Sequence, residues 1–156
     1  MDEEFSEMYR APNNPQRRKR LPRPEPKVFH VHGEGAGRHG KGSGFAWVKP
    51  ITGKKQMKWV DGLTKEEAEY KAVIAVLEYV GEGSRVQIRM DSATVSKQIT
   101  YPLPVRDPRL NALLSEALKL EDEKWLSGVE AMTISRSQNL AAKLFDSAKL
   151  ARRKVK

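Results

Sequence analysis

Apolar and polar residues alternate with a period of two in several short stretches of the chain, which is typical of β-strands. In residues 27–33 (KVFHVHG), for example, His30 and His32 alternate with Phe29 and Val31. Strand-like patterns of this kind, bounded by Gly, Pro and Asp residues, recur further along the chain. Five strands are predicted, over residues 27–33, 42–50, 54–62, 84–91 and 129–135.

Other stretches repeat their apolar residues with the spacing of an α-helix and carry helix start signals. Thr64 followed by Glu67 predicts a capping box, and Asp107 followed by Pro108 predicts a cap with proline at the first helical position. Helices are predicted over residues 63–81, 92–99, 107–122 and 137–153. The order βββ-α-β-α-α-β-α predicts an α/β fold, with three antiparallel strands extended by two parallel strands and helices on both faces of the sheet.

Composition limits the class of protein. Hydrophobic residues make up 38% of the 156 residues, enough for one core. The chain has no cysteine, which excludes disulfides and thiolate metal sites. No apolar run reaches the roughly 20 residues that a membrane span needs. We therefore expect a soluble intracellular, cytoplasmic protein.

The net charge of +9 is concentrated at the two ends of the sequence. Residues 10–27 carry seven basic residues and one acid, residues 149–156 carry five basic residues and no acid, and residues 28–148 have a net charge of only +2. Residues 10–26 also contain five prolines. We therefore predict a disordered basic tail at 1–26, a folded domain at 27–150 and a basic tail at 151–156, with nucleic acid as the partner of the tails.

Five motifs in this order resemble the ribonuclease HI family, and the resemblance spans about residues 27–150. The motifs are GAGRHGKGSG (35–44), AEYKAVIAVLE (68–78), RMDSATVSKQI (89–99), VRDPRL (105–110) and ISRSQNLAAKLFDSA (134–148). The resemblance implies a ribonuclease H-like fold and hydrolysis of RNA in an RNA/DNA hybrid by metal-activated water. It also implies that Glu69 and Asp91 are the second and third of the four family carboxylates, which hold two Mg²⁺ ions.

The chain departs from the family pattern at the other two carboxylates. His32 stands where the resemblance places the first aspartate, which bridges both ions, and Lys143 stands at the fourth position. Neutral histidine suits Zn or Cu better than Mg²⁺, and an ammonium group repels a cation. One hypothesis is that Lys143, with a hydrogen bond from His32, replaces the metal ions electrostatically beside Glu69 and Asp91. The alternative is simple drift, with Lys143 in solvent.

Glu34 leaves an active site open as a second alternative. It lies two residues after His32 in the strand, so both side chains point to the same side if the strand continues. A carboxylate set of Glu34, Glu69 and Asp91 would then bind Mg²⁺. We expect no metal cofactor if the site is degenerate, and Mg²⁺ if it is active.

Several further residues are candidates for binding. His30, His32 and His39 would be needed for a zinc site, and Trp47 and Trp59 could stack on bases or pack together across neighbouring strands. The residues expected to contact nucleic acid are Arg17, Arg18, Lys19, Arg20, Arg38, Lys41 and Arg136.

Three functional classes follow from the sequence. The first, which we favour, is a catalytically degenerate ribonuclease H-like protein that binds RNA or an RNA/DNA hybrid through its backbone. The second is an active metal-dependent hybrid ribonuclease. The third is a structural RNA-binding protein of a ribonucleoprotein particle. Cleavage and binding assays with and without divalent metal distinguish the first two classes.

Overall fold

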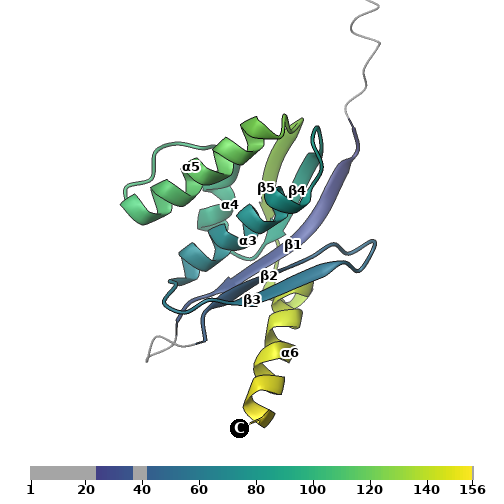
Figure 1. The fold of residues 1–156 in the computed structure, drawn as a ribbon, viewed down its shortest axis with the longest axis vertical. Coiled ribbons are helices and arrows are strands. Elements are labelled where there is room, and N and C mark those ends of the chain that lie inside the picture. The colour runs from purple at the N-terminus through teal and green to yellow at the C-terminus, as the bar shows by residue number, and fades with distance from the viewer. Residues whose placement is uncertain (1–23, 37–41, 156) are drawn as a thin grey trace, which may run out of the picture.

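The computed structural model describes residues 24–36 and 42–155, and its elements follow the predicted order (Figure 1). The strands are β1 (Pro26–Glu34), β2 (Gly44–Val48), β3 (Lys55–Trp59), β4 (Arg85–Met90) and β5 (Gly128–Thr133). The helices are α3 (Lys65–Tyr79), α4 (Ala93–Thr100), α5 (Pro108–Glu123) and α6 (Leu140–Val155), with a short 3₁₀ turn, η2 (Arg136–Gln138), before α6.

The five strands form one mixed sheet in the order β3-β2-β1-β4-β5. β1 pairs antiparallel with β2 and parallel with β4, and β5 extends the parallel part beyond β4. The predicted arrangement of three antiparallel and two parallel strands is thus confirmed. Because β1 is the central strand, its residues from 29 to 33 are buried on both faces.

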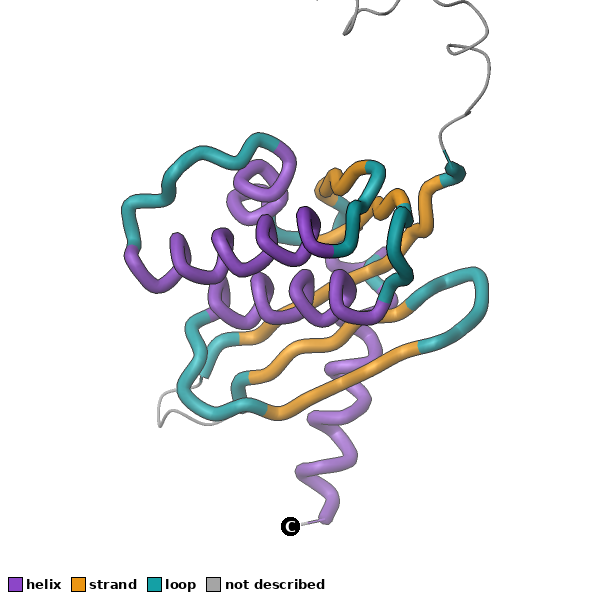
Figure 2. Tube along the Cα trace, turned by 45° about the horizontal axis from the view of Figure 1, so that its top comes forward, coloured by secondary structure: helices purple, strands orange, loops and turns teal. Residues whose placement is uncertain are grey.

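Helices cover both faces of the sheet, and α6 lies on the opposite side from α3, α4 and α5 (Figure 2). Phe29 and Val31 of β1 point into the larger core, which these three helices complete. The next residues along the strand alternate to the other face, where the ring of His32 packs edge-on against Phe145 of α6, with centroids 5.9 Å apart. The period of two therefore separates an apolar face from a face that carries two histidines.

The predicted start signals form the expected hydrogen bonds. The Thr64 hydroxyl accepts from the Glu67 N–H while the Glu67 carboxylate accepts from the Thr64 N–H, which completes the capping box of α3. The Asp107 carboxylate caps α5, and Pro108 is the first residue of that helix. These local signals determine where α3 and α5 begin.

Gly33 allows α3 to approach β1 closely. A Cβ at this position would lie 2.3 Å from the Glu69 backbone nitrogen, closer than real Cβ contacts occur. The lack of a side chain at residue 33 therefore lets the backbone around Glu69 touch the strand that carries His32.

The bounds of β1 and α6 differ slightly from the predicted segment boundaries, and most of the predicted N-terminal tail lies outside the described residues. Tail residues 1–23 are not among the described residues, and Pro26, assigned to the tail, is already the first residue of β1. The helix α6 continues to Val155, so residues 151–155 are helical and not a separate tail. Among the helices in the described part of the chain, none has the length and apolar character that would let it cross a bilayer.

The tryptophans do not pack together across neighbouring strands. Trp47 is buried in the larger core, edge-on against Phe29, and donates a hydrogen bond to Gln56. Trp59 lies on the other face of the sheet, against Phe145 and beneath the guanidinium of Arg152, which is 4.1 Å from the ring centroid. Trp47 therefore has a structural position in the core.

Candidate functional site

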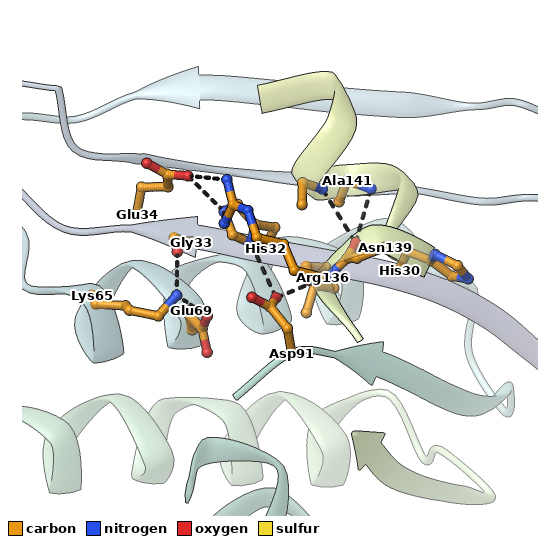
Figure 3. Close-up of polar contacts among 12 residues, drawn as sticks. His30, His32, Gly33, Glu34, Lys65, Glu69, Asp91, Arg136, Asn139 and Ala141 are labelled. Carbon is orange, nitrogen blue, oxygen red and sulfur yellow. Dashed lines mark hydrogen bonds and ion pairs between the residues drawn. The ribbon is translucent and has the colours of Figure 1, made fainter. Parts of the chain in front are cut away.

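The site forms where the ends of β1 and β4 meet the first turns of α3. The two strands are parallel neighbours with His30 opposite Arg89, so His32 and Asp91, each two residues further on, end up side by side. Asp91 follows the last residue of β4 directly, and Ser92 then caps α4. Glu69 reaches the same place from α3 (Figure 3).

His32 is the centre of the site and is completely buried. Its Nδ1 lies 3.1 Å from Asp91 Oδ1, and its Nε2 lies 3.0 Å from Glu34 Oε2. The ring therefore stands between two carboxylates, as Figure 3 shows. When both ring nitrogens carry a proton, His32 donates hydrogen bonds to Asp91 and Glu34. When Nε2 carries no proton, it accepts a hydrogen bond from Arg136, whose NH1 is 3.1 Å away.

Glu34 is held by cationic groups at the edge of the site. The Arg136 guanidinium donates to Glu34 at 2.9 Å and to Asp146 at 2.8 Å, and the Lys149 ammonium donates to Glu34 at 2.8 Å. Burial opposes ionisation of Glu34, yet the hydrogen bonds from Lys149, His32 and Arg136 lower its pKa to about 2. Glu34 is therefore an ionised carboxylate that ties β1 to η2 and α6.

Asp91 is ionised for a related reason. Burial raises its pKa, but the hydrogen bond and charge of His32, together with the charge of Lys65, outweigh burial and lower the pKa to about 2. Asn139 also donates to Asp91 Oδ1 at 3.0 Å and to the Val31 carbonyl at 2.8 Å. The oxygen of the same amide caps α6 by accepting from Ala141 and Ala142.

Glu69 has the most unusual environment of the three acids. Its side chain is completely buried, and Oε2 accepts from Lys65 Nζ at 3.0 Å, one helical turn away on α3. Oε1 is buried and has no hydrogen-bond partner, the only such side-chain atom among the described residues. Burial raises the pKa of Glu69, although the nearby Lys65 charge opposes this. Part of a buried carboxyl group is therefore left without compensation.

One group of potential metal ligands lies in this region. Ligand atoms of His32, Glu69 and Asp91 all lie within 4.8 Å of one another. This set does not fit a pair of Mg²⁺ ions, because Mg²⁺ prefers oxygen ligands and an imidazole offers no oxygen that could bridge two ions. The Lys65 ammonium on Glu69 further disfavours two added cations.

The structure unites only some of the residues selected from the sequence. His32, Glu69 and Asp91 converge, whereas Glu34 lies on the far side of the imidazole and is not part of the group of potential ligands. Lys143 is exposed and forms no ion pair with any residue that the structure describes. The cation beside Glu69 is Lys65. Lys65, and not Lys143, therefore provides the positive charge next to the carboxylates.

The other candidates are placed as follows. Arg136 bonds Glu34 and Asp146 from a half-exposed position. His30 accepts a hydrogen bond from the Leu140 N–H at the start of α6. This contact accounts for the position of His30 without a zinc ion. The predicted contacts Arg17, Arg18, Lys19, Arg20, Arg38 and Lys41, and the third histidine, His39, lie outside the described residues.

Three residues of the site were missed by sequence reasoning. Lys65 precedes Glu69 by four residues, a spacing that predicts an ion pair on a helix and could have been noticed. Asn139 lies inside the ISRSQNLAAKLFDSA motif, but the motif alone does not indicate that its side chain binds Asp91. Lys149 lies near the end of a predicted helix, and this position in the sequence does not indicate a contact with Glu34.

Structure comparison finds ribonucleases H1 as similar proteins. Ribonuclease H1 of the halophilic archaeon Halobacterium salinarum has 26% identity and a TM-score of 0.60, over 76% of this chain and 93% of its own. The N-terminal ribonuclease H domain of a Mycobacterium tuberculosis protein has 22% identity and a TM-score of 0.60, over 80% and 98%.

A third similar structure is LC11 ribonuclease H1 in complex with an RNA/DNA hybrid, from an enzyme isolated from compost by a metagenomic approach. It has 22% identity and a TM-score of 0.63, over 78% of this chain and 97% of its own. No family model matches the sequence, and neither does any curated protein. The fold of the described chain is that of the ribonucleases H1.

Proposed function

We propose that this protein uses its ribonuclease H-like fold to bind RNA or an RNA/DNA hybrid and does not perform Mg²⁺-dependent hydrolysis. The fold is the first support, because a structure with this fold has been solved with an RNA/DNA hybrid. The charge is the second, since a net charge of +9 favours a polyanionic partner. Binding through the phosphate backbone and the A-form shape needs no base-specific contacts.

The observation that carries the proposal is the position of His32. Its two ring nitrogens are engaged by Asp91 and by Glu34, at 3.1 and 3.0 Å. Hydrolysis by two Mg²⁺ ions needs oxygen ligands that hold both ions close together. The two nitrogens of an imidazole point in different directions, so His32 cannot bridge a pair of ions as a carboxylate does.

The remaining charges support the same conclusion. Glu69 is paired with Lys65, Asp91 accepts from His32 and Asn139, and Glu34 is paired with two basic residues. The chain's own donors thus engage all three carboxylates, and only Oε1 of Glu69 is left without a partner among the described residues. Such a cluster can keep the fold of a hydrolytic site without the divalent ions that hydrolysis requires.

The binding half of the proposal is tested by fluorescence anisotropy with labelled hybrid, double-stranded RNA and single strands in EDTA. We expect hybrid or double-stranded RNA to bind, and the affinity to fall at least about tenfold between roughly 50 and 200 mM salt. No binding to any of these nucleic acids, at low salt and with full-length protein, contradicts the proposal.

Two variants test whether the charges of the N-terminal tail contribute to nucleic-acid binding. Replacing Arg17, Arg18, Lys19 and Arg20 with alanine is expected to weaken binding and flatten the salt dependence. Replacing Asp2, Glu3, Glu4 and Glu7 with the matching amides, in the same segment, is expected to strengthen binding. If both variants bound nucleic acid with equal affinity, the N-terminal tail would not be part of the proposed interface.

The hydrolytic half is tested with the same substrates in Mg²⁺. Cleavage that disappears in Glu69→Gln would establish an active ribonuclease and reject the degenerate site. Recovery of the protein on a large ribonucleoprotein particle, with binding to isolated nucleic acid absent, would favour the structural role instead.

A further inference from the structure

We propose that His32, Glu69 and Asp91 bind one Zn²⁺ ion in place of the Mg²⁺ pair that the fold implies. The three side chains come from β1, α3 and the end of β4, and their ligand atoms lie within 4.8 Å of one another. This inference goes beyond nucleic-acid binding and does not depend on it.

The first argument is the unpartnered oxygen of Glu69. A carboxylate that is completely buried normally has both oxygens paired, because an uncompensated buried charge is costly. Lys65 occupies only Oε2, and Oε1 has no donor. A cation bound to the Glu69 carboxylate would compensate the charge that this unpaired oxygen leaves in the interior.

The second argument is the contact between His32 and Asp91. When Nε2 carries the proton and donates to Glu34, Nδ1 presents a lone pair to Asp91 Oδ1, only 3.1 Å away. Two lone pairs at this distance repel unless a cation compensates them. Ligands about 2.0–2.2 Å from one metal ion lie about 3 Å apart when they are adjacent, so the spacing of this pair suits coordination. The whole set lies within 4.8 Å, so Glu69 would have to move inward when an ion binds.

The third argument is the layer of residues behind the three ligands. Metal-binding histidines usually donate their second ring nitrogen to a carboxylate, which orients the ring and sets its tautomer. Glu34 has this relation to His32, and it is itself fixed by Arg136 and Lys149. Each carboxylate ligand also has an outer donor, Lys65 for Glu69 and Asn139 for Asp91.

The ligand types indicate which ions would bind. One imidazole nitrogen with two carboxylates suits Zn²⁺, whereas Mg²⁺ selects oxygen ligands and retains most of its water. Three protein ligands leave coordination positions open. The competing arrangement has Nδ1 protonated toward Asp91 and Nε2 accepting from Arg136, and it leaves His32 no lone pair for a metal.

The test is a metal titration of the full-length protein after removal of metals with EDTA. Calorimetry and thermal unfolding are followed with ZnCl₂ and MgCl₂, without nucleic acid. We expect one equivalent of Zn²⁺ to bind and to raise the Tm, as any ligand of the native state does. Mg²⁺ at the same concentration should leave the Tm unchanged.

Matched variants assign the site. Glu69→Gln keeps the size of the side chain and is expected to abolish the Tm increase, with circular dichroism confirming the fold. Glu34→Gln alters only the outer residue and should weaken metal affinity about 10- to 100-fold. Asp61→Asn, at an exposed position, should bind as the wild type does.

Three results would overturn the inference. They are the absence of Zn²⁺ binding, unchanged binding in Glu69→Gln, and equal effects of Mg²⁺ and Zn²⁺ on the Tm. Because nucleic-acid binding is measured separately in EDTA, failure of the metal site leaves the proposed function standing, and the reverse also holds.

Discussion

His32 Nδ1 lies 3.1 Å from Asp91 Oδ1, at the point where the parallel strands β1 and β4 end next to each other. An imidazole can donate a hydrogen bond to its carboxylate neighbour or share a metal ion with it, whereas a second carboxylate in its place would repel Asp91 unless a cation or a shared proton compensated the two charges. The chemistry of the site therefore depends on residue 32.

Replacing His32 with aspartate should make stability depend on Mg²⁺. The new carboxylate would face Asp91 and Glu69, and an uncompensated charge left in a buried site typically costs about 3–5 kcal/mol. We expect the free energy of unfolding of His32→Asp to fall by about 3 kcal/mol in EDTA and to recover in part with Mg²⁺.

His32→Asn is the matched control for this prediction, because it has the same size as aspartate and no charge. Its free energy of unfolding, measured by urea denaturation, should not respond to Mg²⁺. An equal response of the aspartate and asparagine variants would show that the effect is not electrostatic.

Asn139 is expected to be the most sensitive polar residue at the site. It is completely buried, caps α6, and donates to both Asp91 and the Val31 carbonyl. Loss of a cap costs about 0.5–2 kcal/mol, and unpaired buried groups add about 1–3 kcal/mol. Asn139→Ala should therefore lower the free energy of unfolding by roughly 2–4 kcal/mol, whereas Ser137→Ala, on the exposed turn before it, should change it little.

The close approach of β1 to α3 predicts a strong effect at Gly33. Gly33→Ala places a Cβ 2.3 Å from the Glu69 nitrogen, so the strand or the helix has to move. Overpacking of this kind costs about 1–3 kcal/mol or more. Gly81→Ala, where the added Cβ meets nothing within 4 Å, is the control and should be neutral or slightly stabilising. Similar Tm values for the two variants would contradict the described packing.

Stability should fall in acid because of Glu34 and Asp91. Folding lowers the pKa of Glu34 from 4.5 to about 2 and that of Asp91 from 3.8 to about 2. Below pH 5, the unfolded chain therefore binds more protons than the native protein, so the free energy of unfolding decreases as the pH approaches 2. Glu69 acts in the opposite direction, because its raised pKa favours the native state at low pH.

Urea denaturation between about pH 3 and 6 measures this dependence. Asp91→Asn removes one of the two lowered carboxyl groups and should flatten the curve, and Glu69→Gln should make the acid loss steeper. An unchanged slope in Asp91→Asn would show that this carboxylate is not stabilised in the folded state.

The element order and the helix starts could be predicted because they depend on local signals. The capping box at Thr64 and the proline after Asp107 act over one turn, and the alternation in β1 reflects burial on two faces. The site was predictable to the extent that motif resemblance aligned His32, Glu69 and Asp91. Their convergence follows from the topology of a parallel pair beside a helix.

The charge partners were harder to predict because side-chain direction depends on packing. Lys143 matches the family position in sequence, yet its side chain is exposed, and Lys65 stands beside Glu69 instead. Glu34 is the last residue of β1, but two basic residues from η2 and α6 hold it on the other side of the imidazole from Asp91. Neither arrangement can be deduced without knowing how α6 lies on the sheet.

The most direct test of the central claim is a cleavage assay on an RNA/DNA hybrid with protein in excess, in Mg²⁺, under conditions where binding is verified in parallel. The account predicts that the hybrid is bound and remains intact, in the wild type and in Glu69→Gln alike. Cleavage by the wild type that Glu69→Gln abolishes would contradict it.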